Sequence, residues 1–146
     1  MAEIEIETAI SPYIFIGFMN WAEVNKIKKV LIVDDDVHLA TVLQGMIEAE
    51  GFEVKIAWDG RLGYLTYLHF LPDLVITDIH MPDRDGFEMM RDIRAHSPEV
   101  KTIYMTGDLD RFKCLLEKER ERYRINVLEK PFSKAQLLGL ISESPR

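Results

Sequence analysis

Short apolar runs alternate along the chain with stretches whose apolar residues are spaced three and four apart. The runs are about five residues long and rich in Val, Ile and Leu, which is typical of strands buried on both faces of a parallel sheet. They are KVLIV (29–33), EVKIAW (53–58), DLVIT (73–77), VKTIYM (100–105) and INVL (125–128). The stretches between them predict amphipathic helices with these apolar stripes: Leu39, Leu43, Met46 and Ile47; Leu62, Leu65 and Leu68; Phe87, Met90 and Ile93; Leu109, Phe112, Leu115 and Leu116; Leu137, Leu138 and Ile141.

This alternation predicts an α/β fold, a doubly wound parallel sheet of five strands with helices on both of its faces. The length of 146 residues suits one ordinary domain, which we place at residues 28–146. Ligands of such sheets bind at the carboxyl ends of the strands, so the residues that follow each strand are the candidates for chemistry.

Acidic and hydrogen-bonding side chains follow four of the five predicted strands. The first strand runs into Asp34, Asp35 and Asp36, the third ends at Asp78, the fourth at Thr106 and the fifth at Lys130. Carboxylates gathered at one edge repel one another, and a hard divalent cation such as Mg²⁺ removes that cost. The alternative is that Asp34–Asp36 only cap the following helix, a position that Asp favours.

The same set of groups describes phosphoryl transfer to an aspartate. Lys130 supplies a mobile cation for a phosphoryl oxygen, and Thr106 supplies a hydroxyl donor. A carboxylate nucleophile, a divalent cation and these two groups are the parts that such a transfer needs.

Four ordered motifs resemble the receiver domain of two-component response regulators. They are LIVDDD (31–36), LVITDIHMPDRDGFEMM (74–90), YMTGD (104–108) and EKPF (129–132). The resemblance runs from about Lys28 to Ile141 and implies the flavodoxin-like strand order 2-1-3-4-5. It also implies a regulator rather than an enzyme, with self-catalysed phosphotransfer and slow autodephosphorylation as its only chemistry.

The resemblance implies a role for each site residue. Asp78 would be the phosphoacceptor, Thr106 would bond a phosphoryl oxygen, and Lys130 would bridge Asp78 and the phosphoryl group. Mg²⁺ would be held by Asp35 and Asp78 directly, by Asp34 largely through water, and by the backbone carbonyl of His80. The Lys130–Pro131 bond would be cis.

The resemblance also implies partners. The phosphoryl donor would be a sensor histidine kinase or a phosphotransfer protein. A downstream protein would bind the face formed by the fourth helix, the fifth strand and the fifth helix. Val127 stands where the family usually has a Tyr or Phe, so a switch that rotates an aromatic ring beside Thr106 is not expected.

Composition excludes several other classes of protein. Eighteen Lys and Arg against 25 Asp and Glu give a net charge of −7, which argues against a nucleic-acid partner for this chain. Cys114 is the only cysteine, so an intrachain disulfide is impossible and a reducing, cytoplasmic location is expected. Nothing in the sequence predicts a membrane-spanning segment. Cys114 itself is expected in the core.

Residues 1–27 lie outside the family pattern and form a separate N-terminal extension. It carries large apolar residues, among them Phe15, Phe18 and Trp21, which need to be buried. We expect an ordered arm. Packing on its own domain and packing on a second copy would both satisfy it; we favour a homodimer through residues 1–27.

Two alternatives to the phosphoryl-accepting switch come from other classes. A haloacid-dehalogenase-type phosphatase would use Asp34 and Asp36, but His38 replaces the expected Thr or Val, and only Glu143 follows Lys130 as an acid. A receiver-like scaffold that never takes a phosphate is the other, and the complete acidic site argues against it.

Overall fold

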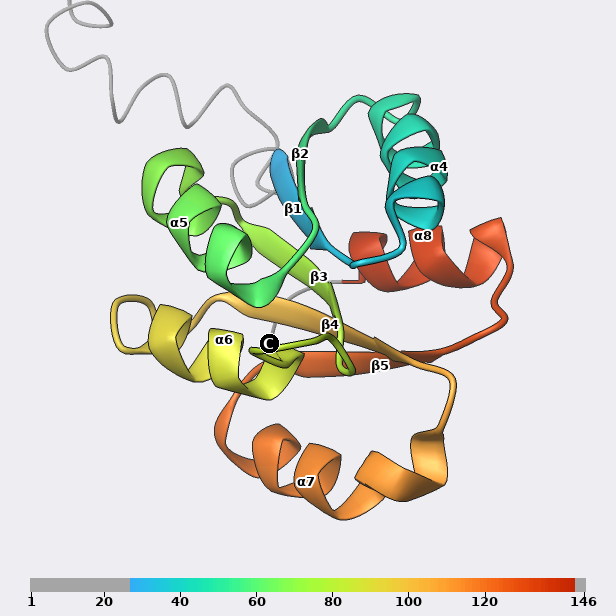
Figure 1. The fold of residues 1–146 in the computed structure, drawn as a ribbon. Helices are drawn as coiled ribbons and strands as arrows, with labels where there is room; N and C mark the ends of the chain where they lie inside the picture. Colours follow the sequence, from blue (N-terminus) through green and yellow to red (C-terminus); the bar gives the residue numbers. More distant parts are fainter. Residues whose placement is uncertain (1–26, 144–146) are drawn as a thin grey trace, which may run out of the picture.

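The computed structural model describes residues 27–143, which fold into five strands and five helices in strict alternation (Figure 1). The elements are β1 (Lys29–Val33), α4 (Val37–Glu48), β2 (Glu53–Ala57), α5 (Gly60–Phe70), β3 (Leu74–Asp78), α6 (Gly86–Arg94), β4 (Lys101–Thr106), α7 (Leu109–Arg122), β5 (Ile125–Glu129) and α8 (Lys134–Ser142). The five predicted strands are confirmed, each to within one residue at its ends.

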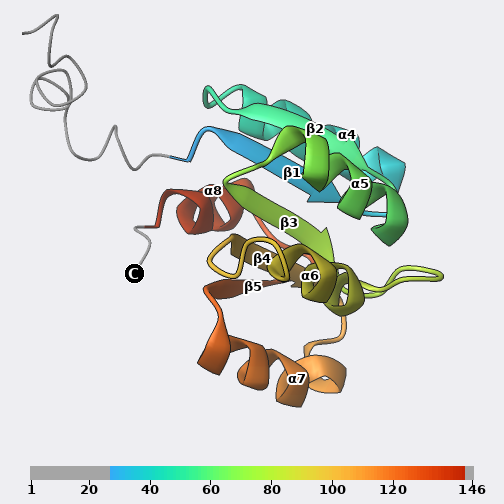
Figure 2. The same ribbon diagram turned by 90° about the vertical axis from the view of Figure 1, so that its left-hand side faces the viewer.

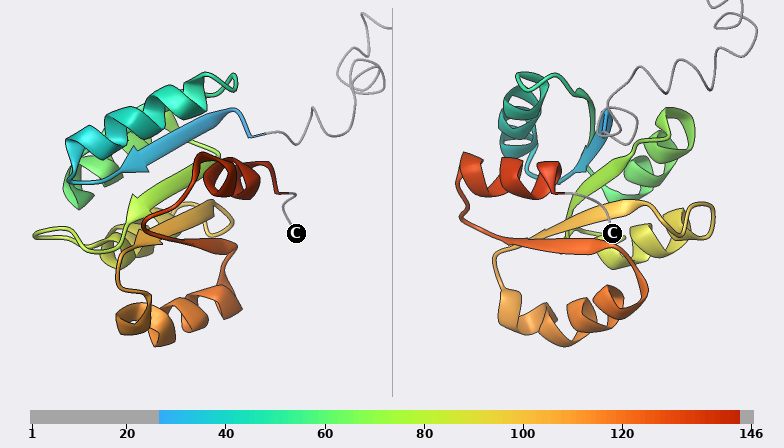
Figure 3. Two further views of the ribbon diagram at one scale, coloured as in Figure 1. Left: turned by 90° about the vertical axis from the view of Figure 1, so that its right-hand side faces the viewer. Right: turned by 180° about the vertical axis from the view of Figure 1, so that it is seen from behind.

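All strand pairs are parallel, and the sheet has the order β2-β1-β3-β4-β5. Helices α5, α6 and α7 cover one face, and α4 and α8 cover the other (Figures 1 and 3). The fold class and strand order expected from the sequence are therefore confirmed. The predicted extension, residues 1–27, lies outside the described residues except for Ile27, so the predicted boundary stays a prediction.

Successive strand side chains enter two separate cores because side chains alternate across a sheet. On the α5–α6–α7 side the buried strand residues include Leu31, Val33, Val75 and Tyr104; on the α4–α8 side they include Val30, Ile32, Leu74 and Ile76. The central strands β1, β3 and β4 are buried along almost their whole length. The edge strand β2 instead exposes Glu53 and Lys55, which corrects the expectation that every strand is buried on both faces.

Two predicted helix stripes are partly wrong. In α5, Leu65 and Leu68 are exposed, and Tyr67 and Phe70 face the core instead. The small Gly63 lets this helix pack closely on both α6 and the sheet, because a Cβ there would lie 2.5 Å from the Met89 sulfur of α6 and 3.0 Å from Cγ2 of Val33 in β1.

In α7, the helix turns a single narrow face to the sheet through Leu109, Phe112 and Leu116. Leu115 is 49% exposed, and Cys114 is exposed as well. The expectation that Cys114 is a core residue is therefore wrong: residues 114 and 115 turn away from the sheet while Leu116, one position on, turns toward it.

Helix starts are fixed by side-chain caps, which set where the loops at the carboxyl edge end. Asp36, Asp59, Asp85, Asp108 and Ser133 each accept a backbone N–H in the first turn of the following helix. The loops between strand ends and these caps all lie at one edge of the sheet, visible where the arrowheads point in Figure 2. Among residues 27–143, no helix is both long and apolar enough to cross a membrane.

Candidate functional site

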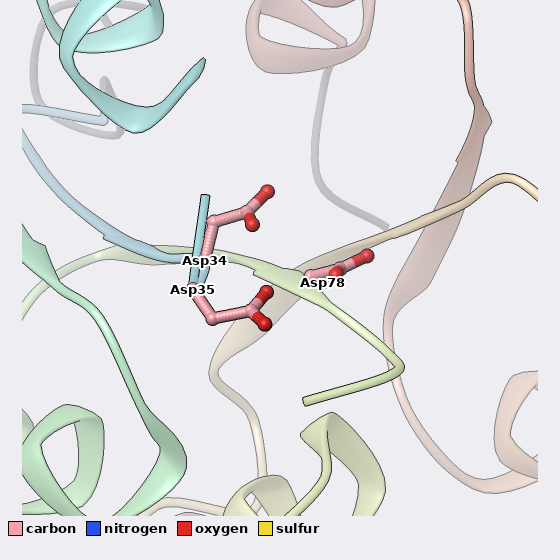
Figure 4. A group of neighbouring side chains, drawn as sticks. All are labelled: Asp34, Asp35 and Asp78. Carbon is pink, nitrogen blue, oxygen red and sulfur yellow. The ribbon is translucent and has the colours of Figure 1, made fainter. Parts of the chain in front are cut away.

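Three acidic side chains meet where β1 and β3 end. Asp34 and Asp35 follow β1 directly, and Asp78 is the last residue of β3. The strands are neighbours, with Val33 beside Thr77, so their ends lie together. Each carboxylate offers one oxygen within 4.8 Å of the others, and all three groups point into a common space (Figure 4).

Asp34 is the most buried member of this cluster, with no exposed surface. Its Oδ1 accepts the backbone N–H of Asp36 at 2.8 Å, which fixes the carboxylate. Burial raises the pKa of Asp34 to about 6, and the charge of Asp78 adds to that rise, while the Asp36 N–H and Lys130 oppose it. A buried carboxylate held ionised at neutral pH is energetically costly until a cation binds beside it.

Lys130, the residue after β5, reaches across to the acidic cluster. Its Nζ lies 3.3 Å from Asp34 Oδ2 and 3.3 Å from Asp78 Oδ1. Burial alone would lower the pKa of Lys130, but the two carboxylates outweigh it and raise the pKa. Burial raises the pKa of Asp78. The charge of Lys130 opposes this rise, and the charge of Asp35 adds to it. The ammonium is therefore held charged between two acids.

Thr106 closes the site from β4. Its side chain is buried, and its Oγ1 accepts the backbone N–H of Asp108 at 2.9 Å. Because that bond uses an oxygen lone pair, the hydroxyl proton is left to be donated to a ligand. A backbone hydrogen bond also joins Thr106 to Lys130, because the Lys130 N–H donates to the Thr106 carbonyl at 2.8 Å. The two residues are thus held in fixed register.

The loop after β3 is shaped by a close backbone approach. Gly86 N–H donates to the Ile79 carbonyl at 2.8 Å, and a Cβ on Gly86 would lie 2.5 Å from the Asp78 carbonyl oxygen. Only glycine allows this packing. The loop presents His80, whose side chain is exposed, at the rim of the site. The Lys130–Pro131 bond is cis, as predicted.

These residues line one hollow of about 450 Å³ at the carboxyl edge of the sheet. Its walls are formed by Asp34, Asp35, Asp36, Asp78, His80, Thr106, Gly107, Asp108, Arg111, Phe112 and Lys130. All the residues predicted from the sequence to form the site are brought together here. Asp36 is the helix cap of the alternative interpretation, accepting Leu39 N–H at 3.1 Å, but Asp34 and Asp35 cap nothing.

The donor set fits a hard divalent cation. Three carboxylates with oxygens close together, one of them fully buried, match the oxygen ligands that Mg²⁺ takes. The Thr106 hydroxyl and the Lys130 ammonium line the same hollow and are groups that bind phosphate oxygens.

Two residues of the hollow escaped the sequence reasoning. Arg111 and Phe112 lie in the first turn of α7 and line the space next to the acids. Their position in the sequence could have identified them, because they follow Thr106 closely, at the start of a helix that begins at the same edge of the sheet. Phe112 had been expected only as a core residue. Val127 is half-buried and lies beside Tyr104 on the neighbouring strand.

Comparison with known proteins places the chain in a family. Residues 30–142 match the family model of the response regulator receiver domain, so the chain belongs to that family. This assignment decides against the haloacid-dehalogenase-type phosphatase.

Curated relatives are longer than this chain. It is 30% identical over 112 residues to the transcriptional regulatory protein RprY of Bacteroides fragilis, covering 75% of this chain and 45% of that protein. It is 28% identical over 139 residues to ZraR of Salmonella typhimurium, covering 80% of this chain and 32% of ZraR. The chain thus spans less than half the length of these relatives.

Two solved receiver-type structures share the fold over nearly their whole length. The chemotaxis protein CheY4 of Vibrio cholerae superposes with a TM-score of 0.71 at 26% identity, over 79% of this chain and 96% of CheY4. The receiver domain of sensor histidine kinase PA1611 of Pseudomonas aeruginosa superposes with a TM-score of 0.65 at 26% identity, over 78% of this chain and 93% of that domain. That structure has a magnesium ion coordinated in its active-site cleft.

Proposed function

We propose that this protein is a signalling switch in which Asp78 accepts a phosphoryl group from a histidine kinase or a phosphotransfer protein. A carboxylate oxygen of Asp78 attacks phosphorus and forms a P–O bond. The P–N bond to the donor imidazole breaks, and the imidazole nitrogen keeps the bonding pair and takes a proton from solvent. The product is an acyl phosphate on Asp78, and the protein is a regulator rather than an enzyme with a substrate of its own.

The observation that carries this proposal is the position of the Lys130 ammonium, 3.3 Å from oxygens of both Asp78 and Asp34. When a phosphoryl group joins Asp78, that ammonium is placed to move from a carboxylate oxygen to a phosphoryl oxygen. The free hydroxyl proton of Thr106 is placed to donate to another. Both contacts stabilise negative charge that the acceptor did not carry before transfer.

Mg²⁺ is the metal we propose for this site. Asp35 and Asp78 would hold it directly, Asp34 largely through water, and the His80 carbonyl would complete the protein's share. Its presence in the PA1611 receiver domain supports the assignment. When bound, it supplies positive charge that offsets the charge of the transferring phosphoryl group.

Incubation with acetyl phosphate and Mg²⁺, followed by intact mass measurement, tests the proposal. We expect one added phosphoryl group on the wild type and none on Asp78→Asn. Asp59→Asn is the matched control, because Asp59 caps α5 without lining the hollow and Asn also caps helices. It is expected to be labelled like the wild type. Labelling of Asp78→Asn would remove Asp78 from its role. A folded, Mg²⁺-bound wild type that takes no label would favour the scaffold interpretation.

We propose that a downstream protein binds the face formed by α7, β5 and α8, as the sequence led us to expect. A groove of about 790 Å³ lies there, and its lining includes the apolar residues Leu116, Val127 and Leu140. Charged side chains, among them Lys113 and Arg120, line it as well. A groove lined by both apolar and charged side chains suits a protein partner.

The remaining predictions concern location and assembly. A cytoplasmic location and the absence of a nucleic-acid partner for this chain stay predictions from its composition. A homodimer through residues 1–27 also stays a prediction, since residues 1–26 lie outside the described part. Light scattering on the full chain and on one that begins at Lys26 tests it. The same number of chains per particle in both proteins would contradict a dimer through residues 1–27.

A further inference from the structure

Arg111 lies beside the acidic cluster in the first turn of α7. Its side chain is exposed and lines the same hollow as Asp78 and Lys130. The backbone there is fixed, because Arg111 N–H donates to Asp108 Oδ1 at 3.3 Å and Asp108 N–H donates to Thr106. The residue is therefore tied by two hydrogen bonds to the strand end that closes the site.

The guanidinium of Arg111 is supported by an aromatic ring. Its central carbon lies 5.0 Å from the centroid of the Phe112 ring, a distance at which a cation is attracted to a ring face. Phe112 is held in turn against Phe87, with the ring centroids 6.1 Å apart. This support restricts a side chain that would otherwise be free in solvent.

The charge of Arg111 is not used within the described residues. Between residues 27 and 143, ion pairs join Arg84 to Asp92, Arg94 to Glu119, and Lys130 to its two acids, but none involves Arg111. A guanidinium is always charged and presents N–H groups in a fork that fits phosphate oxygens. An anion entering the hollow is the partner such a group suits.

The lining of the hollow is acidic, and it keeps a net negative charge even with one divalent cation bound at the acids. Five carboxylates line it, from Asp34, Asp35, Asp36, Asp78 and Asp108, against the two cations Lys130 and Arg111. Lys130 is already engaged by Asp34 and Asp78. A phosphoryl donor is itself anionic and must approach through this negative field.

We propose that Arg111 binds the oxygens of the incoming phosphoryl donor and so selects donors by their charge. This inference rests on the proposed function of Asp78. Arg111 forms and breaks no covalent bond. Its guanidinium N–H groups donate to donor oxygens while the Asp78 oxygen attacks phosphorus and the leaving group departs with its bonding pair. The contact is worth more for a dianionic acyl phosphate than for phosphoramidate, which carries one negative charge fewer at neutral pH.

The test compares two small donors on the full chain. Acetyl phosphate and phosphoramidate are each added with saturating Mg²⁺ at fixed ionic strength, and labelling rates are followed by intact mass. For Arg111→Gln we expect the second-order rate constant for acetyl phosphate to fall about five- to tenfold, the scale of one net hydrogen bond at a solvent-exposed site. The constant for phosphoramidate should change less than about twofold, and Arg111→Lys should be intermediate.

The matched control is Arg91→Gln, which removes an exposed arginine of α6 that does not line the hollow. It is expected to leave both rate constants unchanged. An equal fall for both donors would overturn the inference, because a general disturbance of α7 would slow them alike. Unchanged rates in Arg111→Gln would overturn it too. If the wild type takes label from neither donor, the proposed function of Asp78 fails, and the role of Arg111 fails with it.

Discussion

Replacing Asp34 by Asn should stabilise the metal-free protein. Asp34 is fully buried, and burial raises its pKa to about 6 from 3.8. At neutral pH the fold therefore holds an ionised group that its surroundings disfavour. Asn has nearly the same shape, and its side-chain oxygen can still accept the Asp36 N–H that Asp34 accepts at 2.8 Å.

The size of the expected stabilisation follows from the pKa of Asp34. One pKa unit corresponds to about 1.4 kcal/mol, so the shift of Asp34 amounts to about 3 kcal/mol at neutral pH. The attraction to Lys130 is already contained in that shift. Part of the gain is lost because the Asn amide turns a donor toward Lys130, so we expect a net gain of about 2 kcal/mol, or roughly 5 to 10 °C in Tm.

The sign of the pH dependence is a second check on the same variant. The folded state raises the pKa of Asp34, so its protonation stabilises the fold fully below about pH 4, and this contribution is lost as the pH rises to about 6. The stability advantage of Asp34→Asn should therefore be full above pH 6 and shrink as the pH falls toward 4. Added Mg²⁺ should stabilise the wild type more than the variant.

Urea unfolding followed by circular dichroism, with EDTA present, measures these free energies. Asp36→Asn is the control, since Asp36 is exposed and Asn preserves its cap; its free energy of unfolding should stay within about 0.5 kcal/mol of wild type. The reasoning is refuted if Asp34→Asn is no more stable than wild type at pH 7.5 without metal. An advantage that stays constant from pH 7.5 to 4.5 would also refute it.

Three further predictions concern the metal, the loop after β3 and the buried arginine. Asp35→Ala should weaken Mg²⁺ binding more than Asp34→Ala in isothermal titration calorimetry, because we propose Asp35 as a direct ligand; equal losses would reverse that assignment. Gly86→Ala should cost about 1–3 kcal/mol in urea unfolding, since its Cβ would meet a backbone oxygen at 2.5 Å. Gly139→Ala, in open space on α8, should gain about 0.5–1 kcal/mol, and the same sign for both would contradict the packing argument. Arg94→Ala should lower the free energy of unfolding by about 3 kcal/mol, because Arg94 is 5% exposed and its removal leaves the Glu119 carboxylate without its cation. A loss below about 1 kcal/mol would show that the ion pair contributes little.

The strands and the acidic edge were predictable because their signals are local. A strand buried on both faces reads as an unbroken apolar run, and in a parallel sheet the residue after each run lies at one edge. Asp34, Asp78, Thr106 and Lys130 could therefore be grouped although they are far apart in sequence. The structure confirms that they meet, while their chemical roles stay proposals.

Helix faces were harder to predict because more than one apolar stripe was available. In α5 the leucines suggest one face, but Gly63 lets the helix pack closely through Tyr67 and Phe70. No pattern in the sequence states which of the two faces can approach the sheet more closely. The face of α5 that packs on the sheet is set by how well the shapes of the packed elements fit together.

Polar residues inside the fold were also hidden from the sequence. Arg94 is buried between α6 and α7, where it pairs with Glu119, donates to Thr102 Oγ1 at 3.1 Å and lies 4.0 Å from the Tyr123 ring centroid. Glu119 belongs to the charged run at residues 117–124, most of which is exposed to solvent. The sequence of this run does not show that Glu119 is paired, because its partner Arg94 comes from another helix.

The central claim is that Asp78 carries the phosphoryl group, and chemical trapping tests it most directly. The full chain is treated with acetyl phosphate and Mg²⁺, reduced with borohydride, digested and sequenced by tandem mass spectrometry. An aspartyl phosphate is reduced to homoserine, so our account predicts homoserine at residue 78, dependent on acetyl phosphate. Homoserine at Asp34, Asp35 or any other aspartate, with residue 78 unchanged, would contradict it.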